Sequence, residues 1–194
     1  MAARKKATKG KTARAASTGG RGAASAKTPG AASAAATSLA TQVLETWRVH
    51  AALNELLLDA IPTKGLQARP SGSRGRTVAE QFAHMIRVRL GWLFYQEKGG
   101  RPSAAELPET GLAKARLRSE LRRSARAVEA FLADRLATGQ RIREFRGNPV
   151  RWMGYLIAHD SHHRGSILLA LKQEKVRISE KAKYDLWTRW MSGE

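Results

Sequence analysis

The helical spacing of apolar residues constrains the fold of this chain more than any other feature. Apolar side chains recur every three or four residues in four stretches, close to residues 39–61, 77–98, 110–135 and 149–171, and strand-like alternation is nearly absent. Each stretch would form a helix with one apolar face, and packing four such helices together buries all four faces. The sequence therefore predicts an all-α four-helix bundle, with connections long enough to leave its topology open.

Local signals predict where these helices begin and end. Pro62 follows the first stretch and stops it. Thr77 and Glu80 have the spacing of a capping box at the start of the second stretch. Asn148 and Pro149 are suited to the N-cap and first position of the fourth helix.

Two further segments give weaker signals. The third helix is expected to open at Glu109 or Thr110. A short terminal helix is expected over residues 184–190, where it would lay Trp187 or Trp190 over the bundle. Neither segment changes the predicted fold class.

Residues 1–38 differ in composition from the rest of the chain. They hold eight Lys and Arg, no acidic residue, and no aromatic or large aliphatic residue after Met1. Such a segment buries too little apolar surface to offset the entropy of ordering. We therefore expect a disordered basic arm over residues 1–38 and the bundle over residues 39–194. The arm is either a nonspecific nucleic-acid contact or a solubilising extension.

Composition narrows the classes of function. The chain of 194 residues has a net charge of +19 and no cysteine, which excludes disulfides, thiolate metal ligands and a cysteine nucleophile. No apolar run is long enough to cross a bilayer, and no apolar stretch follows the basic N-terminus as it would in a signal peptide. A cytoplasmic protein without a membrane partner is the expectation, and the sequence leaves open whether it forms a homodimer.

A polar cluster interrupts the apolar pattern of the fourth stretch. Three of the five histidines, His159, His162 and His163, lie there. On a helix, either His162 or His163 shares a face with His159, and two imidazoles one turn apart can begin a transition-metal site. Spacing alone favours neither neighbour.

The remaining histidines are candidates for completing such a site. His84 stands at the edge of the apolar face of the second stretch, deep enough to project between helices. His50 lies on or near the apolar stripe of the first stretch. Taken alone, each is more typical of a packed core histidine than of a metal ligand.

Gly165 lies in the middle of the fourth predicted helix. Glycine in a helix interior costs up to about 1 kcal/mol relative to alanine. Close approach of another helix is therefore the expected reason for this residue.

The motifs in the second and fourth stretches resemble the DinB/YfiT-like family. They are Gln81-Phe82-Ala83-His84 and, later, His159-x-x-x-His163-Arg164-Gly165. The resemblance covers roughly residues 40–190, and it implies a four-helix bundle in which three histidines bind one metal. Carried over to this sequence, it implies His84, His159 and His163 as ligands, with His162 as a neighbour.

The resemblance also implies the kind of chemistry. Relatives include transferases and isomerases that use low-molecular-weight thiols, so a small thiol cosubstrate and a small-molecule substrate are expected. Three imidazole ligands leave an open position, and zinc and nickel both suit such a site. Metal-assisted hydrolysis fits equally well, and the sequence assigns no catalytic residue.

Polar residues around the expected ligands are candidates for contacting the ligands or the substrate. They are Asp160, His162, Arg164 and His50. Arg164 is four residues after Asp160. Its side chain is expected either to pair with Asp160 or to line the pocket.

Two hypotheses from different classes result. The first is a metal-dependent transferase or hydrolase that activates a small thiol or water. The second is a nucleic-acid-associated protein in which the basic arm acts and the metal is structural. Several basic residues on the third stretch, Arg116, Arg118, Arg122, Arg123 and Arg126 among them, would either be solvated or add to such a basic surface.

Overall fold

The computed structural model of this protein describes residues 37–72, 74–100 and 111–193. Over these residues the prediction of an all-α fold is confirmed, and no strand occurs. The arm predicted for residues 1–38 lies outside the described residues except for its last two. The α-helices are α1 (Leu39–Ala60), α2 (Val78–Lys98), α3 (Lys114–Thr138), α4 (Pro149–Gln173) and α5 (Glu180–Ser192), with short 3₁₀ helices η1 (Thr63–Gln67) and η2 (Phe145–Gly147).

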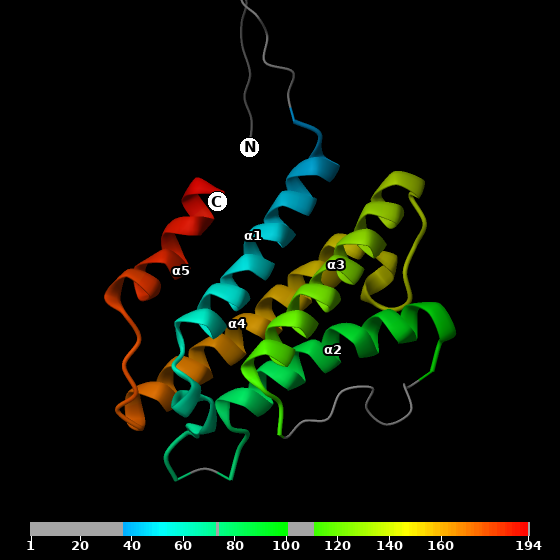
Figure 1. Cartoon of the computed structure of the whole chain (residues 1–194). Coiled ribbons are helices and arrows are strands. Elements are labelled where there is room, and N and C mark those ends of the chain that lie inside the picture. Colours follow the sequence, from blue (N-terminus) through cyan, green and yellow to red (C-terminus); the bar gives the residue numbers. More distant parts are fainter. Residues whose placement is uncertain (1–36, 73, 101–110, 194) are drawn as a thin grey trace, which may run out of the picture. The chain divides into compact units, whose positions relative to one another are not determined.

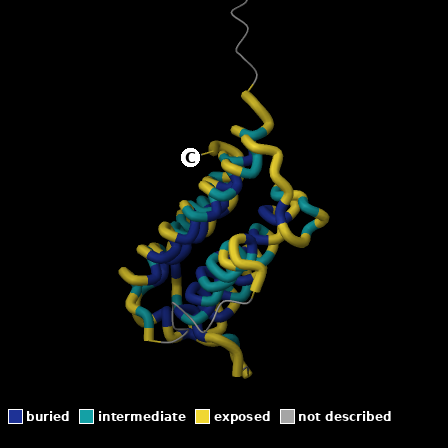
Figure 2. Tube along the Cα trace, turned by 90° about the vertical axis from the view of Figure 1, so that its right-hand side faces the viewer, coloured by how far each residue is buried: buried dark blue, intermediate teal, exposed yellow. Residues whose placement is uncertain are grey.

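Helices α1 to α4 form the bundle (Figure 1). Helix α1 packs against α3, α4 and α5, and α2 packs against α3 and α4. Buried residues follow the inner sides of the helices (Figure 2). They form two apolar clusters, one around Phe82, Leu117 and Leu171 and the other around Trp47 and Trp152. No helix among the described residues is long and apolar enough to span a membrane.

The predicted caps of α2 and α4 are confirmed. The Thr77 hydroxyl accepts a hydrogen bond from the Glu80 amide at 3.2 Å, and the Glu80 carboxylate accepts one from the Thr77 amide at 2.7 Å. The Asn148 side chain accepts one from the Arg151 amide at 3.0 Å. These bonds satisfy backbone donors that an α-helix leaves unpaired in its first turn.

Helix α3 begins later than the sequence predicted. The expected starts, Glu109 and Thr110, lie outside the described residues, and the helix begins at Lys114. Gly111 has a φ of 71°, in the left-handed region, so the backbone shortly before the helix is not helical. The Ala113 N-cap makes no side-chain hydrogen bond, so no capping motif marked the true start.

The terminal helix α5 is longer than the expected segment. Of its two tryptophans, one lies against the bundle and the other is exposed. The Trp190 ring centroid lies 6.4 Å from that of the buried His50, so this tryptophan covers part of the bundle. Trp187 is 74% exposed. Only Trp190 therefore takes the expected position.

The explanation expected for Gly165 is wrong. It faces solvent on α4, and a Cβ atom added there would meet no neighbouring atom within 4 Å. Among the residues that the structure describes, no helix approaches this position closely and nothing else explains the glycine.

We expect Gly165→Ala to raise the free energy of unfolding by about 0.5–1 kcal/mol, because alanine costs less backbone entropy and has room here. Urea denaturation measures the change. Gly65→Ala is the matched control: its Cβ would lie 2.9 Å from side-chain atoms of Ile61 and Val176, so it should destabilise. A destabilising Gly165→Ala would contradict the open environment described for this position.

Candidate metal centre

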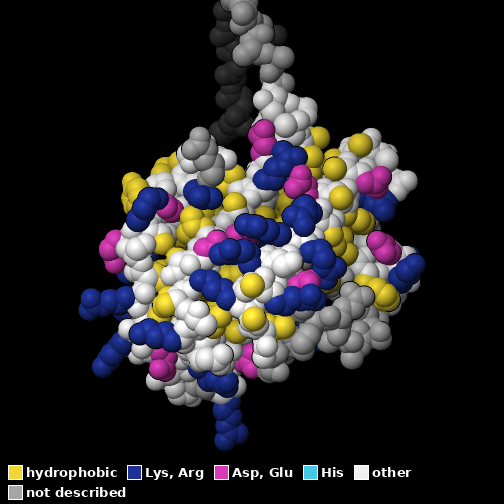
Figure 3. All heavy atoms as spheres, viewed as in Figure 1, with side chains coloured by type: hydrophobic (Ala, Val, Ile, Leu, Met, Phe, Trp, Pro, Cys, Tyr) yellow, Lys and Arg dark blue, Asp and Glu magenta, His cyan; other side chains and the backbone are white. Residues whose placement is uncertain are grey.

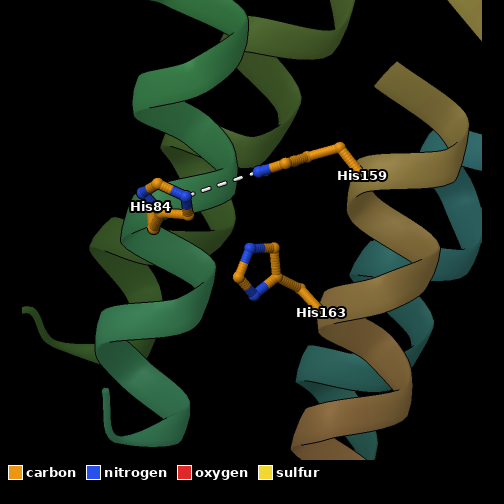
Figure 4. A group of neighbouring side chains, drawn as sticks. All are labelled: His84, His159 and His163. Carbon is orange, nitrogen blue, oxygen red and sulfur yellow. Dashed lines mark hydrogen bonds between the residues drawn. The ribbon is translucent and has the colours of Figure 1, made fainter. Parts of the chain in front are cut away.

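Three histidine rings converge between α2 and α4 (Figure 4). His84 comes from α2, and His159 and His163 come from successive turns of α4. One ring nitrogen from each lies within 4.8 Å of those of the other two. The Nε2 atoms of His84 and His159 are 3.4 Å apart. The structure thus brings together the three histidines that the family resemblance singled out.

The outer nitrogens of two of these rings are held by oxygen acceptors. His159 Nδ1 lies 3.2 Å from Asp160 Oδ1, and His163 Nδ1 lies 3.3 Å from Gln81 Oε1. Because an ionised carboxylate and an amide oxygen only accept, each Nδ1 is the donor. When such a ring is neutral, its lone pair is therefore on Nε2, which is the nitrogen that can bind a metal.

His163 is prepared to stay neutral. It is 9% exposed, and burial lowers its pKa from 6.5 to about 4, with the neighbouring His159 and His84 acting in the same direction. At neutral pH this side chain carries a lone pair and no charge, as a metal ligand must.

Asp160 is the centre of a buried polar network. It is 0% exposed, and its Oδ2 accepts hydrogen bonds from Arg89 Nη2 at 2.5 Å and from Arg89 Nε at 3.1 Å. His50 Nε2 and Asn54 Nδ2 lie 3.0 and 3.3 Å from the same oxygen. Burial by itself raises the pKa of Asp160, but Arg89 together with the bonds from His159 and His50 holds that pKa well below its usual range. The carboxylate is thus charged and orients His159.

His50 belongs to this network and not to the histidine cluster. Its Nε2 donates to Asp160, and its Nδ1 accepts from Arg164 Nη1 at 3.3 Å. Burial lowers the pKa of His50 to about 4, although its bond to Asp160 acts in the opposite direction. His50 is therefore a packed core histidine, and Asp160 lies between it and His159 of the cluster.

Neither Arg164 nor His162 belongs to the cluster of three rings. Arg164 donates to Asn54 Oδ1 at 2.8 Å and to Ser161 Oγ at 2.7 Å, while the ion pair of Asp160 is with Arg89. His162 is exposed, and its ring contacts that of His163 at 5.3 Å. Of the two neighbours that spacing left open, His163 is the one that faces His84.

Aromatic side chains adjoin the cluster. The Tyr155 ring lies 6.2 Å from that of His159, and it contacts Trp92 and Phe145 at 5.7 and 5.4 Å. Phe145 reaches this position from a segment in which Glu144, Phe145 and Arg146 all have positive φ. Such backbone is costly for residues other than glycine and is common at functional sites.

The side chains fit one transition-metal ion. Two nitrogens that share a tetrahedral metal at about 2.0–2.1 Å lie about 3.4 Å apart, which is the spacing of His84 and His159 Nε2. The set contains three imidazoles and no carboxylate, which suits zinc, nickel and neighbouring metals better than calcium or magnesium.

Sequence reasoning missed the residues that support the cluster. Arg89 and Asn54 are buried, and Gln81 was noted only as part of a motif. Arg89 lies three residues after Ile86 and seven after Phe82, on the apolar face of α2, so a charged residue there could have been recognised as needing a buried acidic partner.

The arginines of α3 do not form an open cationic surface. Five of them make ion pairs, and carboxylates lie among the more numerous Lys and Arg side chains on the face shown in Figure 3. The pairs are Arg116–Glu120, Arg118–Asp59, Arg122–Glu55, Arg123–Glu120 and Arg135–Asp134. Much of the positive charge on this helix is therefore neutralised locally.

Comparison with protein families gives a match. The model of the DinB family matches residues 35–174, which is more than half of the chain and runs from α1 to the end of α4. The matched region includes all three clustered histidines. No curated protein matches the chain.

We expect acid to destabilise the metal-free protein through His50. Its pKa is about 4 when folded and 6.5 ordinarily, so between these values the unfolded chain binds a proton that the folded chain does not. The free energy of unfolding should fall as the pH drops from 6.5 to 4, with His50 contributing on the order of 3 kcal/mol.

Urea denaturation at several pH values measures this effect. His163 titrates in the same range, so the contribution of His50 is read from His50→Gln, which keeps a donor toward Asp160 but does not titrate. The variant should lose less stability over this pH window than the unaltered protein. Equal losses would contradict the assignment.

Proposed function

The chain belongs to the DinB family, and we propose that it is a metal-dependent enzyme in which His84, His159 and His163 hold one divalent transition metal. The observation that carries this proposal is the pair of Nδ1 hydrogen bonds on His159 and His163. These bonds leave Nε2 of each ring for a metal, and one ring nitrogen from each of the three histidines lies within 4.8 Å of the other two. The packed core histidine His50 uses both of its ring nitrogens in bonds to non-histidine side chains, whereas in the cluster one nitrogen of each ring faces the other two imidazoles.

Zinc or nickel is the metal we propose. Imidazole binds both metals. Neither the Irving–Williams order of affinities nor the type of ligand selects one of them here. Because no carboxylate belongs to the three-residue set, the ligands offset none of the charge of a divalent ion. An anionic occupant of the remaining position is therefore favoured over a neutral one.

We propose that the reaction uses a small thiol or water. When bound, the metal would lower the pKa of such a molecule and so supply a nucleophile at neutral pH. The chain has no cysteine, so a thiol must come from a cosubstrate. A transferase uses the thiol and a hydrolase uses water, and both fit three protein ligands with one open position.

The chain's own residues position the ligands. Asp160 accepts from His159, and Arg89 keeps that carboxylate charged within the bundle. Gln81 accepts from His163 and fixes its ring. Such supporting bonds commonly contribute 10–100-fold to metal affinity. Arg164 is turned toward Asn54, so we assign it to the network and not to substrate binding.

The aromatic neighbours suggest which part of a substrate lies beside the histidines. Tyr155 is 40% exposed and stands between His159 and the rings of Trp92 and Phe145. An apolar or aromatic portion of a small-molecule substrate would contact this wall while its reacting group faces the histidines.

The alternative proposal is a nucleic-acid-associated protein with a structural metal. Because arginines of α3 are paired with carboxylates, the bundle is a poor candidate for the nucleic-acid contact. In this proposal the basic residues 1–38 would make that contact. The division into an arm (1–38) and a bundle (39–194) remains part of this proposal.

We expect the purified protein to hold about one equivalent of divalent transition metal. His84→Ala combined with His159→Ala should remove it, because only one of the three nitrogens would remain. Asp160→Asn should weaken the metal affinity by about 10–100-fold through loss of the charged acceptor. Elemental analysis and competition with a chelator measure both effects.

His162→Ala is the matched control, since this exposed residue is next in sequence to His163 but outside the cluster. It should leave metal content nearly unchanged. Metal retained by the double variant, or lost in His162→Ala, would contradict the ligand assignment.

A second prediction separates the thiol reaction from hydrolysis. If a thiol is the cosubstrate, a small thiol added to the Co(II)-substituted protein should produce a sulfur-to-metal charge-transfer band, because cobalt reports thiolate coordination. His159→Ala should abolish the band. If millimolar thiol leaves the Co(II) spectrum unchanged, metal-assisted hydrolysis becomes the better proposal while metal binding itself stands.

A further inference from the structure

A cavity separate from the histidine cluster lies where α4 ends, along the connection of residues 174–179 and beside α5. Its volume is about 710 Å³, which is in the range of small-molecule sites. We propose that this cavity binds a small amphipathic anion, meaning a molecule with an apolar body and one carboxylate, phosphate or sulfate head group. The proposal does not depend on a metal at the histidines.

The floor of the cavity is aliphatic and fixed. Leu171, Ile178 and Leu186 line it, and each is at most 9% exposed. All three belong to the larger apolar cluster of the bundle, and the partly buried Leu168 and Val176 pack against that cluster beside them. An apolar body entering the cavity would therefore meet a preformed surface that does not have to be ordered first.

The rim of the cavity is cationic. Four exposed basic residues line it, and no acidic residue does so among the described residues. They are Lys172, Lys175, Arg177 and Lys183. Lys and Arg side chains also project in Figure 3 from the region where Figure 1 draws the connection from α4 to α5. Cations gathered around an apolar floor attract an anionic head group and repel a cationic one.

Trp187 supplies an exposed wall next to this rim. It lines the cavity and is 74% exposed, so a large apolar ring remains in water unless something covers it. An apolar body lying between Trp187 and the aliphatic floor would bury part of the ring. The combination of one aromatic wall, an aliphatic floor and four cations favours a single amphipathic anion over a nucleic acid, which would need successive stacking surfaces.

The test uses calorimetric titration of the full chain with three ligands of equal chain length, each below its micelle concentration or solubility limit. Decanoate should bind with a stoichiometry near one. Decanol lacks the charge and should bind at least about tenfold more weakly. Decyltrimethylammonium should give no binding, because its charge is repelled by the rim. Rising salt should weaken decanoate binding.

Two matched pairs of variants on α5 locate the binding. Lys183 and Lys181 both form ion pairs within the helix, with Glu180 and Asp185, but only Lys183 lines the cavity. Lys183→Glu should weaken decanoate binding about tenfold, and Lys181→Glu, with the same change in net charge, less than about twofold.

The second pair tests the apolar wall. Trp187 and Tyr184 are 74% and 68% exposed, and only Trp187 lines this cavity. Trp187→Ala should weaken decanoate binding several-fold, and Tyr184→Ala should not. Because both side chains are largely exposed, circular dichroism should show an unchanged fold for both.

Several results would overturn the proposal. They are the absence of decanoate binding at millimolar concentration, equal binding of the cationic ligand, and equal effects within the two matched pairs. Binding of phosphatidylglycerol vesicles without binding of monomeric decanoate would instead identify the same residues as a membrane contact. Binding of single-stranded DNA but not decanoate would identify them as a nucleic-acid contact.

Discussion

The buried ion pair between Arg89 and Asp160 holds the described structure together at its centre. Both side chains are 0% exposed, and their contacts reach four helices. Asp160 on α4 accepts from His50 and Asn54 on α1, and Arg89 on α2 donates to Leu121 and Ser124 on α3. Removing one partner would leave an uncompensated charge, which typically costs 3–5 kcal/mol. The relative placement of α1 to α4 therefore depends on this pair.

The same pair connects the stability of the bundle to the histidine cluster. Asp160 uses one oxygen for Arg89 and the other for His159 Nδ1. Helix α2 contributes both Arg89 and His84, and α4 contributes both Asp160 and His159. The packing of these two helices therefore positions the carboxylate together with two of the three clustered rings. A site on rigid helices keeps its side chains within the narrow tolerance that metal binding requires.

Features encoded by neighbouring residues were predictable from the sequence, and features encoded by distant ones were not. The capping box at Thr77 and the cap at Asn148 use residues three positions apart, so the sequence displays them directly. The ion pair of Asp160 joins positions 71 residues apart, and its choice of Arg89 over the nearer Arg164 depends on how α2 meets α4. Spacing also left His162 and His163 equivalent; the family resemblance selected His163, and it is His163 that faces α2.

The polar network is better explained by the orientation of His159 than by stability alone. Replacing a buried ion pair with apolar residues of similar volume is often neutral or stabilising, because charges lose their hydration when buried. Apolar residues at positions 89 and 160 could therefore fill the same space in this bundle. They could not accept the Nδ1 proton of His159, and the ring would lose the bond that directs its Nε2 toward His84. A buried carboxylate kept charged by an arginine therefore orients the ring of His159 at this crossing, whatever it contributes to the free energy of folding.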